Sequence, residues 1–147
     1  MDDAEHNSKM KQVQAAHQEK MAEKQDAARG LLLVITGDGK GKSTSAFGMV
    51  VRALGWRQKV GVVQYIKGNW KTGERLFFKD RPDLVTWHTM GQGFTWDTQD
   101  RAKDMEAAEA AWSISREMLS SGDYDLIVLD ELNIALRYEY LDIDEIV

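Results

Sequence analysis

Thr36-Gly-Asp-Gly-Lys-Gly-Lys-Ser-Thr44 is the stretch that decides the fold of this chain. It follows a continuous apolar run, Leu31 to Ile35, and precedes a helical pattern from Ser45 to Leu54. A strand, a glycine-rich turn and a helix, in this order, are the setting of a phosphate-binding loop. Glycines let the backbone curl around an anion, and the first helical turn directs free N–H groups at it. A plain solvated turn does not account for the flanking strand and helix, so the stretch predicts a site for a nucleoside triphosphate.

Two side chains of the loop carry specific expectations. Lys42 is placed to reach the outer phosphates, and Ser43 to bring its hydroxyl to a magnesium ion. The usual pattern opens with glycine five residues before the Gly-Lys pair, where this chain has Thr36, so the loop is a variant with additional glycines. We predict nucleotide contacts along the whole loop, from Thr36, Gly37, Asp38, Gly39, Lys40, Gly41, Lys42, Ser43 and Thr44.

A later apolar strand ends in two acids. Tyr124 to Leu129 is followed directly by Asp130 and Glu131. A carboxylate at the end of such a strand faces the phosphate loop and holds magnesium, directly or through water. The sequence therefore predicts a metal site made by Ser43, Asp130 and Glu131, and leaves open which of the two acids binds the ion directly.

The elements between these motifs complete an α/β pattern. We expect strands over residues 31–36, 59–66 and 84–88, and helices over 74–79 and 99–120, the latter begun by Asp97 or Thr98 and ended by Gly122. The fold class is α/β, a mostly parallel sheet with flanking helices, of the P-loop NTPase (RecA-like) type. Such sheets usually continue past the acidic strand, and residues 142–147 resemble the first turn of a helix. We therefore expect the chain as given to be truncated at its C-terminus.

The N-terminal part has a different character. Residues 1–28 are polar, and only Met10, Val13, His17 and Met21 form a thin apolar stripe at helical spacing. This predicts a mobile helical extension, with a plain solvated extension as the alternative. The nucleotide-binding domain then comprises residues 29–147, incomplete at its C-terminus.

Composition narrows the function classes. The chain has 147 residues, a formal net charge of −5 and no cysteine. This charge argues against a general nucleic-acid binder, and the lack of cysteine excludes disulfides and thiolate chemistry within it. No apolar run approaches the roughly 20 residues of a membrane span, and the polar N-terminus is unlike a secretory signal. We expect a cytoplasmic protein that binds neither membrane nor nucleic acid.

Holding a triphosphate leaves the reaction open, because one fold serves phosphoryl transfer, hydrolysis coupled to motion, and attack elsewhere on the nucleotide. Five segments occurring together and in order are more specific. They are Gly37-Asp-Gly-Lys-Gly-Lys-Ser-Thr44, Val60-Gly-Val-Val-Gln-Tyr-Ile-Lys-Gly68, Gly73-Glu-Arg75, Gly93-Phe-Thr-Trp-Asp-Thr-Gln99 and Val128-Leu-Asp-Glu-Leu-Asn133. Over about residues 9–147 the chain resembles the ATP:corrinoid adenosyltransferases, the phosphate-loop enzymes that adenosylate cobalamin.

The resemblance implies a particular reaction. Co(I) of a reduced corrinoid attacks the 5′ carbon of ATP, and triphosphate leaves whole, in adenosylcobalamin synthesis or salvage. ATP and the corrinoid are substrates, Mg²⁺ is the cofactor, an electron-donating reductase such as a flavoprotein is a partner, and the protein is a homodimer. The N-terminal helix would fold over the site when corrinoid is bound.

The resemblance also assigns residues. Lys42 would stabilise the departing triphosphate, while the rings of Phe94 and Trp96 would replace the lower ligand of cobalt. The alternative for these rings is an ordinary core role. Apart from the resemblance, the loop after the second expected strand lies at the edge where open parallel sheets bind ligands. Contacts to nucleotide or corrinoid, with plain surface roles as the alternative, are therefore expected from Gln64, Lys67, Asn69, Trp70, Glu74 and Arg75. Two other functions stay open at this point: a phosphoryl-transfer ATPase or kinase, and a nucleotide-binding switch.

Overall fold

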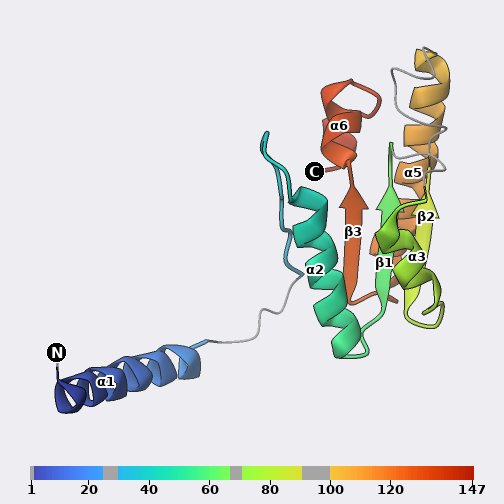
Figure 1. Cartoon of the computed structure of the whole chain (residues 1–147). Coiled ribbons are helices and arrows are strands. Elements are labelled where there is room, and N and C mark those ends of the chain that lie inside the picture. The colour runs from blue at the N-terminus through green and yellow to red at the C-terminus, as the bar shows by residue number, and fades with distance from the viewer. Residues whose placement is uncertain (1, 25–29, 67–70, 91–99) are drawn as a thin grey trace. The chain divides into compact units, whose positions relative to one another are not determined.

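The computed structural model describes residues 2–24, 30–66, 71–90 and 100–147. The chain divides into two compact units, residues 1–34 and residues 35–147. Figure 1 labels the helices and strands of both units.

The first unit contains the helix α1 (Asp3–Ala22), which confirms the helix predicted for the extension. Its start is capped by Asp2, whose side chain accepts a 2.8 Å hydrogen bond from the backbone N–H of Glu5. No residue of α1 is buried, and Met10, Val13 and Met21 are 43, 55 and 49% exposed. The apolar stripe is thus present, and none of its residues is buried in the part of the unit that the structure describes.

The strand predicted over residues 31–36 is wrong, because this stretch is neither helix nor strand in the structure. Its side chains are exposed, with Leu31 and Leu32 at 83 and 85%. The boundary between the two units falls after Val34, inside the apolar run. An apolar run becomes a strand only where a neighbouring strand pairs with its backbone, and periodicity alone does not supply that partner.

The second unit is built on a parallel sheet of three strands, β1 (Val60–Gln64), β2 (Val85–Thr89) and β3 (Leu126–Asp130). Their order is β2-β1-β3, so β1 is central and fully buried (Figure 1). In the register, Gln64 lies opposite Thr89 on one side and Asp130 on the other. The last residues of all three strands therefore form one row across the carboxyl edge of the sheet.

Helices cover both faces of this sheet. On one face, α2 (Lys42–Gly55) and α3 (Gly73–Lys79) contribute Phe47, Val50, Ala53 and Phe78 to a core with Val60, Val62, Val85 and Val128. On the other, α5 (Arg101–Ser121) and α6 (Leu132–Arg137) flank a second core. The 3₁₀ helix η1 (Ile143–Glu145) precedes Ile146, which packs against this core. That core includes Val63, Ala108, Ala111, Trp112, Met118 and Ala135. The predicted α/β architecture with a parallel sheet and flanking helices is confirmed.

The ends of α5 show one difference from the sequence expectation. The helix is capped by Asp100, whose side chain accepts from the Lys103 backbone N–H. The predicted caps, Asp97 and Thr98, lie outside the described residues. Its predicted end is confirmed, since Gly122 takes the left-handed conformation with φ of 72°. None of the helices within the described ranges is long and apolar enough to span a membrane.

Gly61 explains how the sheet and α5 pack so closely. A Cβ atom at this position would lie 3.0 Å from Sδ of Met118 and 3.4 Å from a ring carbon of Tyr124. Gly61 is the second residue of the central strand and faces the second core, in a strand interior where glycine is otherwise unfavourable. Its lack of a side chain is what admits Met118 against β1.

Candidate nucleotide site

The glycine loop joins directly onto α2. The helix begins at Lys42, three residues before the predicted start, and Gly41 caps it with a left-handed φ of 102°. Gly37 also has a left-handed φ of 123°. Non-glycine residues adopt this region only with strain, so these two glycines let the loop turn twice within five residues. The first N–H groups of α2 have no acceptor within the helix and point toward the loop end.

Lys42 lies against the backbone of its own loop. Its ammonium donates a 2.7 Å hydrogen bond to the carbonyl of Gly37 and a second bond to the carbonyl of Gly39. A lysine ammonium has three N–H donors, so these two contacts leave one for an anion. The loop itself is exposed. The positive charge thus sits at the helix N-terminus, where the dipole of α2 also favours a negative ligand.

Asp130 brings the end of β3 to the loop. It is only 7% exposed, and its Oδ1 accepts a 2.9 Å hydrogen bond from the Ser43 hydroxyl. Its Oδ2 accepts a 2.9 Å bond from Nε2 of Gln64. The contact exists because α2 packs on the sheet face that carries Asp130, so Ser43 lies over the strand end. The structure therefore joins two of the three residues predicted for the metal site.

Thr89 and Trp87 also join the hydrogen-bonded cluster around Asp130, and neither was predicted as a site residue. Oε1 of Gln64 accepts from the Thr89 hydroxyl at 3.4 Å, and the Thr89 oxygen accepts from the indole N–H of Trp87 at 3.1 Å. The position of Thr89 in the sequence could have indicated its role, because polar residues that end parallel strands meet at one edge of the sheet. The predicted third strand stopped at residue 88, one residue before Thr89.

Two further predicted residues, Glu131 and Arg75, lie at the starts of helices. Glu131 caps α6 with a left-handed φ of 66°, so the chain turns sharply directly after Asp130. Arg75 lies half-buried in the first turn of α3, where its backbone N–H donates to the Thr72 hydroxyl. Lys67, Phe94 and Trp96 lie outside the described residues.

The donor set at Ser43 and Asp130 fits magnesium. A hydroxyl and a carboxylate are hard oxygen ligands, and Mg²⁺ usually takes one or two protein carboxylates and completes its shell with phosphates and water. Within residues 2–24, 30–66, 71–90 and 100–147, no three His, Cys, Asp or Glu side chains cluster as a metal cage would require. Two protein ligands, Ser43 and Asp130, suit an ion whose other ligands are phosphates and water.

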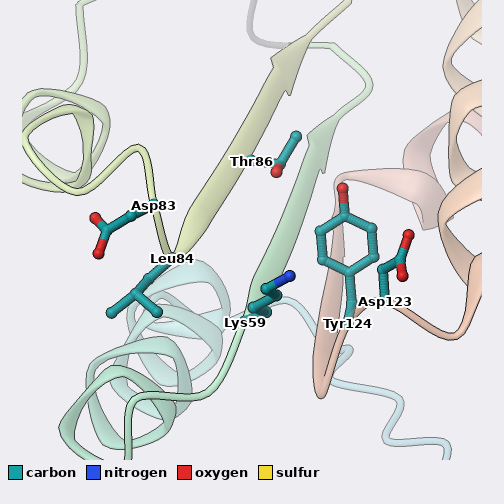
Figure 2. Close-up of a pocket in the computed structure, with 6 residues that line it drawn as sticks. All are labelled: Lys59, Asp83, Leu84, Thr86, Asp123 and Tyr124. Carbon is teal, nitrogen blue, oxygen red and sulfur yellow. The ribbon is translucent and has the colours of Figure 1, made fainter.

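A pocket of about 230 Å³ lies at the opposite edge of the sheet (Figure 2). Lys59 precedes β1, Leu84 precedes β2 and Tyr124 comes shortly before β3, so the pocket is at the amino ends of the strands. Asp83, Thr86 and Asp123 complete its lining. Ligands of open parallel sheets bind at the carboxyl ends, so the loop and Asp130, and not this pocket, form the candidate nucleotide site.

Comparison with known proteins identifies the family. The family described as "ATP:corrinoid adenosyltransferase BtuR/CobO/CobP" matches residues 28–147. The chain belongs to this family. The match covers the loop, the sheet and both strand-end acids, and so includes every element of the nucleotide site described above.

Individual adenosyltransferases are similar over nearly the whole chain. The corrinoid adenosyltransferase of Pseudomonas aeruginosa is 54% identical over 144 residues, which cover 98% of this chain and 70% of that protein. Its counterpart from a Sinorhizobium species is 48% identical over 147 residues, covering 99% and 68%. That of Escherichia coli K12 is 42% identical over 147 residues, covering 100% and 74%.

Proposed function

We propose that this protein transfers the 5′-deoxyadenosyl group of ATP to the Co(I) centre of a reduced corrinoid and releases triphosphate. Family membership over residues 28–147 is the observation that carries the proposal. The contact between Ser43 on the phosphate loop and Asp130 at the end of β3 supports it, because the pair supplies what the triphosphate end of ATP requires.

The reaction is a substitution at carbon. Co(I) of the substrate donates an electron pair to C5′ of ATP, a cobalt–carbon bond forms, and the C5′–O bond breaks with its electrons passing to triphosphate. No water attacks, so the site needs no general base. Its tasks are to stabilise charge on the departing triphosphate and to hold C5′ in line with the metal of the ring.

The loop suits the first task. Lys42, Lys40 and the N–H groups at the start of α2 supply fixed positive charge and donors where the triphosphate develops its charge. We place magnesium at Ser43 and Asp130, with Glu131 as a ligand or as a partner of a bound water. When bound, the ion would neutralise part of the charge on the leaving group.

The second task falls to residues near the corrinoid. We assign Phe94 and Trp96 to the lower face of the ring, where apolar rings in place of a ligand make Co(I) easier to reach. Lys67 and Arg75 are proposed contacts to nucleotide or corrinoid. A reductase, such as a flavoprotein, would deliver the electron, and a homodimer is the expected assembly.

The test is a reaction mixture of the protein, MgATP and chemically reduced cob(I)alamin. We expect the absorption spectrum of the adenosylated corrinoid to appear, with triphosphate released in equal amount. Release of ADP or inorganic phosphate without an adenosylated product would instead indicate phosphoryl transfer or hydrolysis. ATP binding without turnover of either kind would indicate a nucleotide switch.

A further inference from the structure

A row of polar side chains crosses the carboxyl edge of the sheet. Thr89, Gln64 and Asp130 are paired in register and are the last residues of β2, β1 and β3. All three lie on the face that packs against α2, since Val85, Val62 and Val128 at alternate positions belong to that core. Ser43 and Trp87 meet the two ends of the row.

The hydrogen bonds along this row run in one direction. The indole N–H of Trp87 is only a donor, so the Thr89 oxygen is the acceptor of that 3.1 Å bond. The single Thr89 proton then goes to Oε1 of Gln64 at 3.4 Å. With its oxygen facing Thr89, the amide presents Nε2 to Oδ2 of Asp130 at 2.9 Å. The inverted amide would set an oxygen against the carboxylate and would lose the Thr89 donor, so Asp130 and Thr89 together fix the orientation of the Gln64 amide.

The surroundings hold this row in place. Gln64 is 2% exposed, so protein groups and not solvent set the orientation of its amide. The ring of Trp87 stacks on Phe47 and Phe78, with centroids 5.4 and 5.9 Å apart. The donor that starts the row is therefore fixed by an aromatic cluster linking α2, α3 and β2.

We propose that Thr89 and Gln64 are positioning residues for Asp130. Gln64, held by Thr89, donates to Oδ2, while Oδ1 is turned toward Ser43 and the proposed magnesium position. Gln64 then acts through Asp130 and makes no direct contact with the nucleotide. The proposal rests on the proposed function, in which Asp130 holds the metal. Partners behind a metal ligand typically contribute 10–100-fold to metal affinity or activity.

The experiment measures two properties besides turnover. The first is Mn²⁺ binding in the presence of ATP, titrated by electron paramagnetic resonance, since Mn²⁺ accepts the same oxygen ligands as Mg²⁺. The second is the side-chain amide resonance of Gln64, assigned by its disappearance in Gln64→Leu. Thr89→Val keeps the shape of the side chain and removes the hydroxyl, whereas Thr89→Ser keeps the hydroxyl. Thr86→Val is the matched control in the same strand, on the opposite face and beside the pocket of Figure 2.

We expect Thr89→Val to weaken Mn²⁺ binding by about 10-fold and to shift the Gln64 amide resonance. Thr89→Ser should restore both, and Thr86→Val should alter neither. Unchanged affinity and an unchanged resonance in folded Thr89→Val would overturn the proposal. If Thr89→Val does not fold, Trp87→Phe, which keeps the stacked ring and removes the indole N–H, must shift the Gln64 resonance, and no shift would overturn it.

The same titration separates this proposal from the metal assignment on which it rests. Failure of the unsubstituted protein to bind Mn²⁺ with ATP would contradict the metal site at Ser43 and Asp130. Normal binding there, combined with no effect of Thr89→Val, would contradict only the positioning role.

Discussion

The hydroxyl of Ser43 donates a 2.9 Å hydrogen bond to Oδ1 of Asp130, across 87 positions of the chain. The two residues meet because α2 packs over the sheet and because β3 ends level with β1. The loop that would hold the triphosphate and the acid that would hold its metal are thereby fixed to the same core. The nucleotide site is thus supported by the most buried part of the second unit.

The first prediction concerns Lys42. Replacing it with Ala removes the positive charge at the N-terminus of α2, and we expect turnover at saturating ATP to fall by about 100-fold or more. Triphosphate release with preformed cob(I)alamin is the measurement. Lys59→Ala, at the opposite edge of the sheet, is the control and should retain the rate. A near-normal rate for Lys42→Ala would remove this loop from catalysis.

A second prediction separates the two strand-end acids. Asp130→Asn should raise the Mg²⁺ concentration needed for half-maximal activity, by about 10-fold or more, because the buried carboxylate oxygen at Ser43 loses its charge. Glu131→Gln should have the smaller effect, since Glu131 follows the strand in a left-handed turn. Mg²⁺ titrations of both variants at fixed ATP measure this. If neither variant changes the Mg²⁺ dependence, the metal is held by other groups.

The glycine loop and the strand-end acid could be found from the sequence, because glycine spacing and an acid after an apolar run are local patterns. The three strands of the sheet, the helices α1, α2, α3 and α5, and Gly122 as a helix end were predictable for the same reason. The network behind Asp130 was not, since the contact of Gln64 with Thr89 depends on sheet register, which no local pattern specifies. The strand predicted over residues 31–36 was wrong because strand pairing is also non-local. An apolar run indicates only that a segment is suited to burial.

The third prediction tests the packing at Gly61. A methyl group there would lie 3.0 Å from Sδ of Met118, so Gly61→Ala should lower the free energy of unfolding by about 1–3 kcal/mol. Gly48→Ala in α2 is the matched control, because a Cβ atom added there would meet no neighbouring atom within 4 Å. This substitution should raise the free energy of unfolding by roughly 0.5–1 kcal/mol. Urea unfolding of both variants gives the comparison. Equal effects of the two substitutions would mean that α5 moves away from β1 without cost.

A fourth prediction concerns stability at alkaline pH. The hydroxyls of Tyr65 and Ser115 lie 2.8 Å apart, and Ser115 gives its own proton to the carbonyl of Ala111, so Tyr65 is the donor of this pair. Burial raises the pKa of Tyr65 from 10.0 to about 12, although the bond to Ser115 lowers it in part.

Because the pKa of Tyr65 is raised in the folded state, the contribution of its protonated hydroxyl to stability is complete below pH 10. This contribution is lost as the pH rises toward 12. Between pH 10 and 12 Tyr65 ionises in the unfolded chain before it ionises in the folded protein. This difference lowers the free energy of unfolding by up to about 3 kcal/mol. Urea unfolding from pH 9 to 12 should therefore show a shallower decline for Tyr65→Phe than for the unsubstituted protein. Parallel declines would show that Tyr65 ionises equally in both states.

The last prediction concerns Phe94 and Trp96, which lie outside the described residues and whose proposed role rests on the family resemblance. Replacing both with Ala should affect reduction of the corrinoid and not the phosphate chemistry, because a lower ligand on cobalt stabilises Co(II) against reduction. Activity starting from cob(II)alamin and a mild reductant should fall steeply. Activity starting from preformed cob(I)alamin should fall less, since the difficult reduction has already occurred, and ATP affinity should change little. If the rings serve only the core, their loss acts through stability and lowers both activities alike. Equal losses in the two assays, for a variant shown by its unfolding transition to be folded, would therefore exclude the rings from the mechanism.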